Sequence, residues 1–302
     1  MLTVHTPSKV NLVLEVLGKA GDYHRISSVV QSIDLCDVLS FDPDGEIRFE
    51  CDEPALENDN LVTRAAVLLR RRTGCASGAR IRLHKCIPWS AGLGGGSSDA
   101  AAVLLGLNEL WRLGLSIREL LGLGSELGSD VPFFLHGGTA LVEGRGEVVT
   151  PLPPWPPTCF VLLVPSLTRM EGKTGQMYAR LTGTHFTDGR RVQECVAALR
   201  QGKAVDRTVM VNVFESVAYD LMPELDAYRK ALLEAGAPAV HLAGSGPCLF
   251  ASLSAREKAV ELLSHLKKQG FECYLAASCS GYKILQGLPG LQTGSVDEYE
   301  DG

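Results

Sequence analysis

The chain of 302 residues has a formal net charge of −6 at pH 7 and is 45% apolar, which suits one large domain or two of ordinary size. The acidic balance argues against nucleic acid as the main partner, and the longest apolar run, residues 159–164, is too short to cross a membrane. Nine cysteines without a C-x-x-C pair, and an N-terminus without a long apolar run, are typical of a reduced cytoplasmic protein.

The first segments of the chain predict a β-rich start. Apolar residues alternate from position 10 to position 16, so residues 1–17 are expected to form a strand, a turn and a second strand. Lys9 and Asn11 then share the opposite face, where spacing alone favours an ordinary surface pair. The next predicted elements are a turn at 19–24, an extended run at 26–35, a hairpin at 38–51, a helix at 61–72 capped within residues 58–60, and a strand at 79–83.

The segment Pro88-Trp-Ser-Ala-Gly-Leu-Gly-Gly-Gly-Ser-Ser98 holds four glycines within five positions. Apolar residues at helical spacing follow it, with Ser97 or Ser98 as the expected cap of the helix and Gly114 as its expected end. A helix N-terminus offers free N–H groups and a partial positive charge, so this segment predicts a phosphate-binding loop. A flexible loop that merely caps the helix is the simpler alternative, but a linker would not usually lead straight into a strongly periodic helix.

Two common types of phosphate loop do not fit this segment. A Walker A loop has lysine after its last glycine, whereas Ser97 follows Gly96 here. The dinucleotide-binding fingerprint needs a third glycine where Ser97 stands, and Pro88 interrupts the strand that should lead into it. The sequence therefore predicts a phosphate loop of another class.

The chain continues with a predicted helix at 116–127 and then Asp130, which stands where a short helix would begin. Asp130 as a helix cap and Asp130 as a chemical group are about equally supported, and the two roles do not exclude each other. Five prolines within residues 150–158 argue against a helix and against a central strand. We therefore place a domain junction there.

The second half of the chain mixes strands and helices. The predicted elements are a buried strand at 160–164, helices at 173–181, 191–200, 222–235 and 255–269, a strand–turn–strand at 240–253 around Gly244-Ser-Gly-Pro247, and a strand at 272–277. Residues 285–302 are glycine-rich and then acidic, which predicts a disordered tail. The expected division is an N-terminal domain at 1–157, a C-terminal domain at 158–284 and this tail.

Three separated segments resemble one family, the GHMP small-molecule kinases: Ser8-Lys-Val-Asn-Leu12, the glycine segment at 88–98, and Gly244-Ser-Gly246. Within these kinases, Tyr23-His24, the triple glycine and Gly128-Ser-Asp-Val-Pro132 resemble the branch that phosphorylates CDP-methylerythritol in the non-mevalonate isoprenoid pathway. The resemblance covers residues 2–283. It implies an α+β, two-domain GHMP-kinase fold, with an N-terminal ribosomal-protein-S5-like α/β domain, a C-terminal α+β domain and the active site between them.

The resemblance implies phosphoryl transfer from ATP, with Mg²⁺ carried by ATP, to the 2-hydroxyl of CDP-methylerythritol. Lys9 and Asp130 match the catalytic pair of the family. In these roles Asp130 accepts the proton of the attacking hydroxyl, and Lys9 orients that hydroxyl and stabilises charge on the transferred group. Ser98 is a candidate magnesium ligand by analogy with the superfamily. The family likeness further implies a monomer or homodimer without nucleic-acid or membrane partners.

The resemblance also assigns binding residues. The ATP site comprises Asn60, Leu61, Lys85, Pro88, Trp89, Ser90, Ala91, Gly92, Leu93, Gly94, Gly95, Gly96, Ser97 and Ser98. The substrate site comprises Asn11, Tyr23, His24, Thr174 and Tyr178. Stacking of the two tyrosines on cytosine would contribute about 1–3 kcal/mol per base, and ordinary half-buried packing is their alternative role.

Two positions depart from the family pattern. Gly21-Asp22 stands where Asp-Gly is frequent, and Ser90-Ala91 stands where glycine is common. We expect the first to shift the cytidine loop slightly and the second to stiffen the phosphate loop.

The alternatives are another GHMP kinase, acting on homoserine, mevalonate or a sugar, and a non-catalytic nucleotide-binding regulator on the same fold. The predicted base sandwich argues against the first, because a small acid or sugar needs none. The presence of both Lys9 and Asp130 argues against the second.

Overall fold

The computed structural model describes residues 1–56, 60–168 and 170–286. Its strands are β1 (Leu2–Ala20), β2 (Tyr23–Asp44), β3 (Ile47–Cys51), β4 (Gly78–His84), β5 (Thr139–Gly144), β6 (Val148–Pro151), β7 (Cys159–Leu163), β8 (His241–Leu242), β9 (Leu249–Leu253), β10 (Cys273–Ala277) and β11 (Lys283–Gln286). Its α-helices are α1 (Leu61–Thr73), α2 (Gly95–Leu110), α3 (Ile117–Leu127), α4 (Val131–His136), α5 (Lys173–Arg180), α6 (Arg190–Arg200), α7 (Glu215–Leu221), α8 (Leu225–Glu234) and α9 (Arg256–Lys268). Short 3-10 turns occupy Pro54–Leu56, Gly183–His185 and Arg207–Val209.

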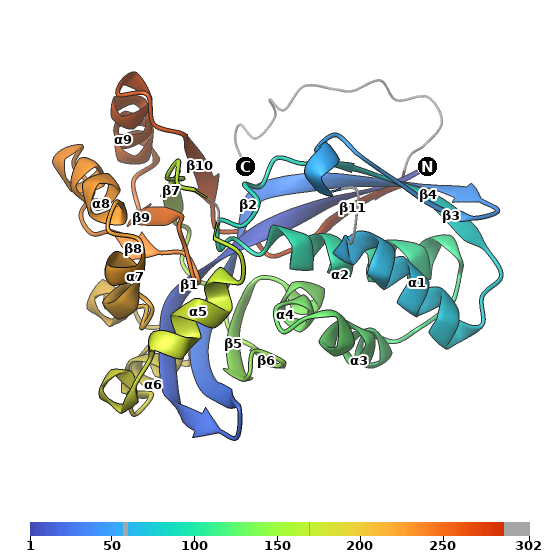
Figure 1. Cartoon of the computed structure of the whole chain (residues 1–302), viewed down its shortest axis with the longest axis horizontal. Helices are drawn as coiled ribbons and strands as arrows, with labels where there is room; N and C mark the ends of the chain where they lie inside the picture. The colour runs from blue at the N-terminus through green and yellow to red at the C-terminus, as the bar shows by residue number, and fades with distance from the viewer. Residues whose placement is uncertain (57–59, 169, 287–302) are drawn as a thin grey trace.

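The described strands form two sheets (Figure 1). The first has seven strands in the order β11-β1-β2-β4-β3, and β5 pairs with β2 and β6. The second has four strands in the order β10-β7-β9-β8. This mixture of helices and largely antiparallel sheet is the α+β class that the sequence predicts.

A single long ladder between β1 and β2 forms the centre of the first sheet. It runs from the pair Leu2–Phe41 to the pair Ala20–Tyr23, with register shifts at three points, the first between Pro7 and Ser8. The turn expected within residues 1–17 is therefore wrong, because that stretch belongs to one continuous strand. A proline has no N–H for the ladder, and a local shift in register accommodates it. The turn at Gly21–Asp22 is confirmed.

The predicted hairpin at 38–51 is also wrong. β4 lies between β2 and β3, pairing antiparallel with β2 and parallel with β3. The apolar residues Ala79, Ile81 and Leu83 of β4 are all buried, whereas β3 alternates with the charged, exposed Arg48 and Glu50. The more apolar strand therefore takes the inner position and the charged strand takes the edge.

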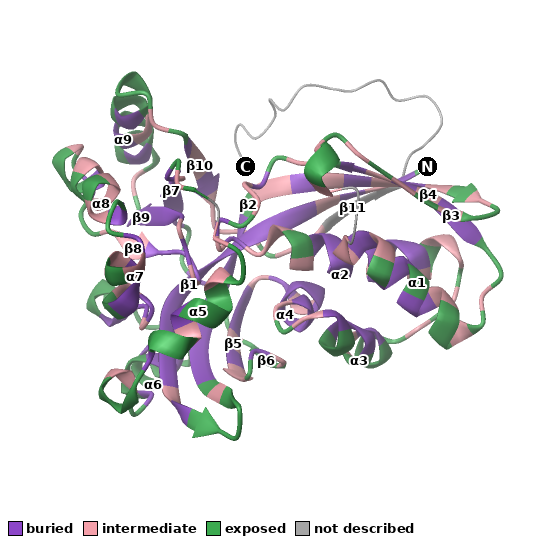
Figure 2. Cartoon of the chain, in the orientation of Figure 1, coloured by how far each residue is buried: buried purple, intermediate pink, exposed green. Residues whose placement is uncertain are grey.

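Helices α1 to α4 cover one face of the first sheet, and their buried residues face it (Figure 2). α2 is buried along most of its length, and Gly106 in its last turn lets the ring of Phe41 approach. The predicted cap of α1 is confirmed, and α3 has a capping box that was not predicted. Asn60 accepts a 2.8 Å hydrogen bond from the N–H of Val62, and Ser116 forms a capping box with Glu119.

The second sheet carries α8 and α9 on its outer side, while α5, α6 and α7 lie nearer the first sheet (Figure 1). The helix expected at 222–235 is shorter, and α7 precedes it without having been predicted. Backbone hydrogen bonds of Leu14 with Val211 and Val213 join the long β1 strand to this half of the chain. The two halves therefore meet along β1, the strand that also carries Lys9.

The end of the described chain returns to the first sheet. Leu285 and Gln286, expected in the tail, belong to β11 and pair with Thr3 and Leu2. The tail prediction is therefore corrected at these two residues, since the free edge of β1 offers them hydrogen-bond partners. The rest of that prediction falls on residues 287–302, outside the described residues. Among the described helices, none is both long and apolar enough to cross a membrane.

Candidate active site

A pocket of about 780 Å³ lies where the two halves of the chain meet. It is lined by most of the residues that the sequence assigned to a site: Lys9, Asn11, Asn60, Leu61, Lys85, Pro88, Trp89, Ser90, Ala91, Gly92, Leu93, Gly94, Gly95, Gly96, Ser97, Asp130, Thr174 and Tyr178. Ser98, Tyr23 and His24 are not among its lining residues. The fold thus gathers segments from β1, the glycine loop, the start of α4 and the start of α5 around one cavity.

The glycine loop, residues 88–96, leads into α2 in a different way from the one predicted. α2 begins at Gly95, its N-cap is Gly94 with φ +76°, and no side chain caps it. The expected capping by Ser97 or Ser98 is therefore wrong, because the helix already starts inside the glycines. The hydroxyl of the fully buried Ser98 donates to the Pro7 carbonyl at 2.6 Å instead.

Packing explains two glycines of this loop. A side chain at Gly92 would collide with the Ala243 carbonyl, and one at Gly94 would come within 2.8 Å of the Phe134 ring. Gly96 differs, because a Cβ there would meet only Leu61, at 3.8 Å, and the residue lines the pocket. The start of α2 therefore has open space in front of its free N–H groups, as an anion site requires.

Three donors from separate elements hold the loop. The N–H of Lys9 donates to Leu93 O at 2.9 Å, and the N–H of Cys248 donates to Ala91 O at 3.1 Å. The ammonium group of Lys173 donates to Ser90 O at 2.9 Å. Both halves of the chain therefore position the same loop.

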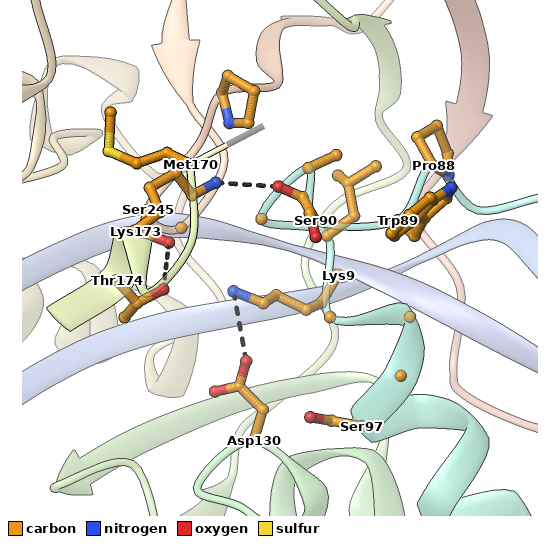
Figure 3. Close-up of a pocket in the computed structure, with 18 of the residues that line it drawn as sticks. Lys9, Pro88, Trp89, Ser90, Ser97, Asp130, Met170, Lys173, Thr174 and Ser245 are labelled. Atoms are coloured by element: carbon orange, nitrogen blue, oxygen red, sulfur yellow. Dashed lines mark hydrogen bonds and ion pairs between the residues drawn. The ribbon is translucent and has the colours of Figure 1, made fainter. Parts of the chain in front are cut away.

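Lys9 and Asp130, 121 positions apart, face each other across the pocket floor (Figure 3). Lys9 Nζ lies 3.8 Å from Asp130 Oδ2 and donates to Asn11 Oδ1 at 2.7 Å. Asn11 is held in turn by its own donation to Ser28 Oγ at 2.9 Å. Asp130 stands at the N-cap position of α4, but its side chain makes no capping hydrogen bond. The Asp130 side chain therefore does not cap α4.

Lys85, which is predicted to lie near the adenosine, lines the pocket, but its ammonium group is already paired. It contacts both Asp37 and Asp99, the latter at 3.1 Å, and all three side chains are nearly inaccessible to solvent. Burial raises the pKa of Asp99 to about 7, against the opposing effect of the Lys85 charge. Sequence reasoning missed both carboxylates, although Asp99 directly follows Ser98 of the loop segment.

The aromatic residues are arranged differently from the predicted sandwich. His24 stacks on Tyr178 with ring centroids 5.0 Å apart, and Phe214 meets Tyr178 edge-on at 4.9 Å. Tyr23 is 57% exposed, outside the pocket lining, with the Arg145 guanidinium 4.6 Å from its ring centroid. The structure thus brings His24 and Tyr178 together and places Tyr23 beside Arg145. Burial raises the pKa of Tyr178 to about 12, so its ring is neutral at physiological pH.

Two neighbouring residues at the start of α5 line the pocket, and only one of them was predicted from the sequence. Thr174, predicted near the substrate, has its hydroxyl 2.8 Å from that of Ser245 in the second glycine turn. Its neighbour Lys173, not predicted, contacts the carbonyls of both Ser90 and Gly246. In the sequence, Lys173 directly precedes Thr174, which was assigned to the substrate site, and this adjacency could have pointed to Lys173.

A metal carried by ATP would find few protein ligands. No cluster of three or more His, Cys, Asp or Glu side chains suited to a metal occurs in the described parts of the chain. Ser98 is fully buried and does not line the pocket, and its assignment as a magnesium ligand stays a prediction. Oxygen-bearing side chains that line the pocket near the start of α2 are Asp130 and Ser97 (Figure 3), together with Asp99, which is paired with Lys85.

The sequence of the chain matches two profiles of one kinase superfamily. The "GHMP kinases N terminal domain" profile matches residues 60–138, and the "GHMP kinases C terminal" profile matches residues 195–272. Together these stretches include the glycine loop, Asp130 and the second glycine turn.

Known proteins give a more specific result. A 4-diphosphocytidyl-2-C-methyl-D-erythritol kinase of Dehalococcoides mccartyi is 44% identical over 280 residues, which cover 92% of this chain and 98% of that protein. One of Symbiobacterium thermophilum is 42% identical over 88% of this chain and 95% of its own length.

Solved structures agree with the sequence relatives. The crystal structure of a 4-(cytidine 5'-diphospho)-2C-methyl-D-erythritol kinase matches with a TM-score of 0.78 and 33% identity, over 91% of this chain and 98% of that one. A homoserine kinase of Cytophaga hutchinsonii matches at 20% identity with a TM-score of 0.73, over 94% and 97% of the two chains, which shows a shared fold. The two-domain GHMP-kinase fold is therefore confirmed, and the chain belongs to the 4-diphosphocytidyl-2-C-methyl-D-erythritol kinase family of ATP-dependent GHMP kinases.

Proposed function

We propose that this chain transfers the γ-phosphoryl group of ATP to the 2-hydroxyl of 4-diphosphocytidyl-2-C-methyl-D-erythritol, giving the 2-phosphate and ADP in the non-mevalonate route to isoprenoid precursors. The observation that carries the proposal is the Lys9–Asp130 pair beside the open N-terminus of α2. Phosphoryl transfer depends mainly on positioning and on charge stabilisation, and these groups supply both.

ATP binds with its phosphates at the start of α2. The free N–H groups and the dipole of that helix attract the phosphate oxygens, and Gly96 leaves room for them. Asn60 and Leu61, at the start of α1, line the adenosine side together with Lys85. Lys85 acts there through its position between Asp37 and Asp99 rather than as a free cation.

Asp130 acts as the general base. Its carboxylate is 48% exposed and faces the pocket, so an acceptor hydroxyl can approach it within hydrogen-bond distance. Lys9 is held by Asn11 and stabilises the negative charge that develops on the transferred group. Asn11 therefore acts through Lys9 as well as lining the pocket beside the substrate.

The cytidine moiety binds on the aromatic side of the pocket. Tyr178 offers a neutral ring supported edge-on by Phe214, and His24 lies over it. A cytosine that takes the place of His24 gains about 1–3 kcal/mol from stacking on Tyr178. We place Tyr23, which lies one residue before His24, on the other face of the base. Thr174, next to Ser245, contacts the rest of the substrate.

The magnesium ion, the location and the oligomeric state stay predictions. Mg²⁺ would arrive with ATP and neutralise phosphate charge, with Asp130 and Ser97 as the oxygen donors within reach of it. A cytoplasmic monomer or homodimer is expected from the nine cysteines and from the family likeness.

A coupled assay of ADP release tests the proposed substrate. The purified chain is given ATP with CDP-methylerythritol, homoserine or mevalonate in parallel reactions. We expect turnover with the first only, since neither small acid has a base to stack on Tyr178. Turnover with homoserine or mevalonate instead would assign another GHMP activity, and no turnover with any of them, despite ATP binding, would favour a non-catalytic regulator.

A further inference from the structure

Lys173 lines the pocket at the start of α5, and the reaction described above gives it no role. Its ammonium group donates to Ser90 O at 2.9 Å and to Gly246 O (Figure 3). Ser90 belongs to the glycine loop and Gly246 to the second glycine turn. One side chain therefore joins two backbone segments that come from opposite halves of the chain.

Ser90 is the place where the loop needs such support. Its φ is +58°, a left-handed conformation that glycine adopts freely and that costs other residues energy. The charge-assisted hydrogen bond from Lys173 to the Ser90 carbonyl offsets that conformational cost.

The surroundings of Lys173 explain why the bond is strong. Burial lowers the pKa of Lys173 to about 8, and the nearby charge of Lys9 acts in the same direction. An ammonium group in this position needs acceptors close to it, and the two carbonyls supply them. Losing the Ser90 carbonyl would remove one of the two acceptors of this partly buried ammonium group.

We propose that Lys173 is a positioning residue for ATP, which holds Ser90 in its left-handed conformation and fixes the glycine loop to the second glycine turn and to α5. The proposal deepens the proposed function and rests on ATP binding at this loop. Because α5 also carries Tyr178, the same bridge connects the ATP side of the pocket with the cytidine side.

The experiment measures the binding of AMP-PNP, a non-hydrolysable ATP analogue, by isothermal titration calorimetry. Lys173→Met is expected to weaken AMP-PNP binding by about 5- to 30-fold. This factor corresponds to the free-energy cost of a left-handed backbone conformation at one non-glycine residue. Ser90→Gly alone should bind at least as tightly as the wild type. The double variant should recover most of the loss, because glycine keeps φ +58° without the lysine. In ADP-release kinetics, KM for ATP should rise more than kcat falls.

Controls separate this role from general damage. Lys203→Met removes an exposed lysine outside the pocket lining and should leave AMP-PNP affinity unchanged. Melting temperatures show whether each variant is folded, and Lys173→Ala, which also removes the donor, replaces Lys173→Met if that variant does not fold.

Two outcomes overturn the proposal. The first is unchanged affinity for AMP-PNP in folded Lys173→Met or Lys173→Ala. The second is a loss that Ser90→Gly does not recover, which would mean that Lys173 contacts the nucleotide directly. The titration contains no acceptor, so a wrong acceptor under the proposed function would not change its result.

Discussion

Lys9 and Asp130 differ in exposure, and this difference separates their roles at the residue scale. The Lys9 side chain is 7% exposed and bonded to Asn11, whereas that of Asp130 is 48% exposed. A substrate hydroxyl can therefore reach the carboxylate, while the lysine stays fixed at its side. The backbone N–H of Lys9 also holds Leu93 of the glycine loop, so the same residue positions part of the ATP site.

Asp130→Asn tests the base. Because the Asp130 side chain makes no capping hydrogen bond, and asparagine caps about as well as aspartate, the melting temperature should hardly change. Loss of a general base typically lowers kcat about 10²- to 10⁴-fold, with ATP affinity nearly kept. Lys9→Met should cause a loss of similar kind, and the double variant should be little worse than the poorer single one. A folded Asp130→Asn enzyme with a kcat near the wild-type value would remove Asp130 from the mechanism.

Tyr178→Ala tests the base-stacking site. Removing the ring should raise KM for the CDP substrate about 5- to 150-fold, the equivalent of 1–3 kcal/mol of stacking, and leave KM for ATP nearly unchanged. Tyr228→Ala is a matched control, because Tyr228 also packs edge-on against a phenylalanine, Phe271, but lies outside the pocket lining. Equal effects of Tyr178→Ala on both KM values would show that the residue is structural.

At the element scale, the glycine loop and α2 form one unit anchored at both ends. The loop is tied to β1 through Lys9 and Leu93, and to the second glycine turn through Cys248 and Ala91. The first turn of α2 is tied to β4 and β2 through the cluster of Lys85, Asp37 and Asp99. The free N–H groups therefore keep their orientation before any phosphate arrives, which reduces the ordering cost of binding.

Gly96→Val tests the phosphate site. Gly95 is a poorer choice, because a Cβ there would lie only 3.1 Å from Ile87. At Gly96 the added side chain has room at its Cβ but enters the space that the phosphates need, so ATP binding should fall at least tenfold while the fold survives. Gly122→Val, on an exposed position of α3, controls for the cost of valine in a helix. Unchanged ATP affinity in folded Gly96→Val, measured by calorimetry, would contradict the assignment.

Asp99→Asn tests the buried cluster through the pH dependence of stability. The folded state raises the pKa of Asp99 to about 7, above the ordinary value of 3.8, so the folded chain binds a proton that the unfolded chain has lost. The stability from this group is present below about pH 4 and is lost as the pH rises through about 7. Between about pH 5.5 and pH 8, the free energy of unfolding should therefore fall less for Asp99→Asn than for the wild type. Urea titration at each pH measures this difference. An identical loss in both proteins would show that Asp99 ionises normally.

At the scale of the whole molecule, the last described strand lies at the edge of the first sheet, and the residue before it contacts the start of α2. β11 pairs with the first residues of β1, and the hydroxyl of Tyr282 donates to Ser98 O at 2.9 Å at the start of α2. The end of the C-terminal half of the chain thus supports the helix that binds ATP in the N-terminal half.

Two truncations distinguish the contribution of β11 from that of the acidic segment at 287–302. Truncation after Gln286 should change neither the melting temperature nor the activity, because residues 287–302 are rich in glycine and acidic side chains. Truncation after Gly281 removes β11 and Tyr282, and should lower the melting temperature by roughly 5 °C or more and weaken ATP binding. A melting temperature that falls equally in both variants would show that the acidic segment itself stabilises the fold.

Local features of the fold could be predicted from the sequence because neighbouring residues decide them. Asn60 caps α1, as the sequence predicts, through a hydrogen bond that spans only two residues. The four glycines ahead of a periodic apolar stretch likewise indicate a phosphate loop from local chemistry alone. The identities of Lys9 and Asp130 came from the resemblance to a family rather than from their spacing.

Only the tertiary structure decided which distant residues meet. β4 entered between β2 and β3 because its buried apolar face outweighs the short link between the other two strands. Ser98 donates to the Pro7 carbonyl, and Lys85 pairs with two carboxylates. Buried polar groups must form hydrogen bonds, and the packing of the chain decides which partners lie within reach. The sequence by itself determined the local chemistry of the glycine loop and the cap at Asn60. The 3.8 Å approach of Lys9 to Asp130, across 121 positions, depends instead on contacts that no local pattern encodes.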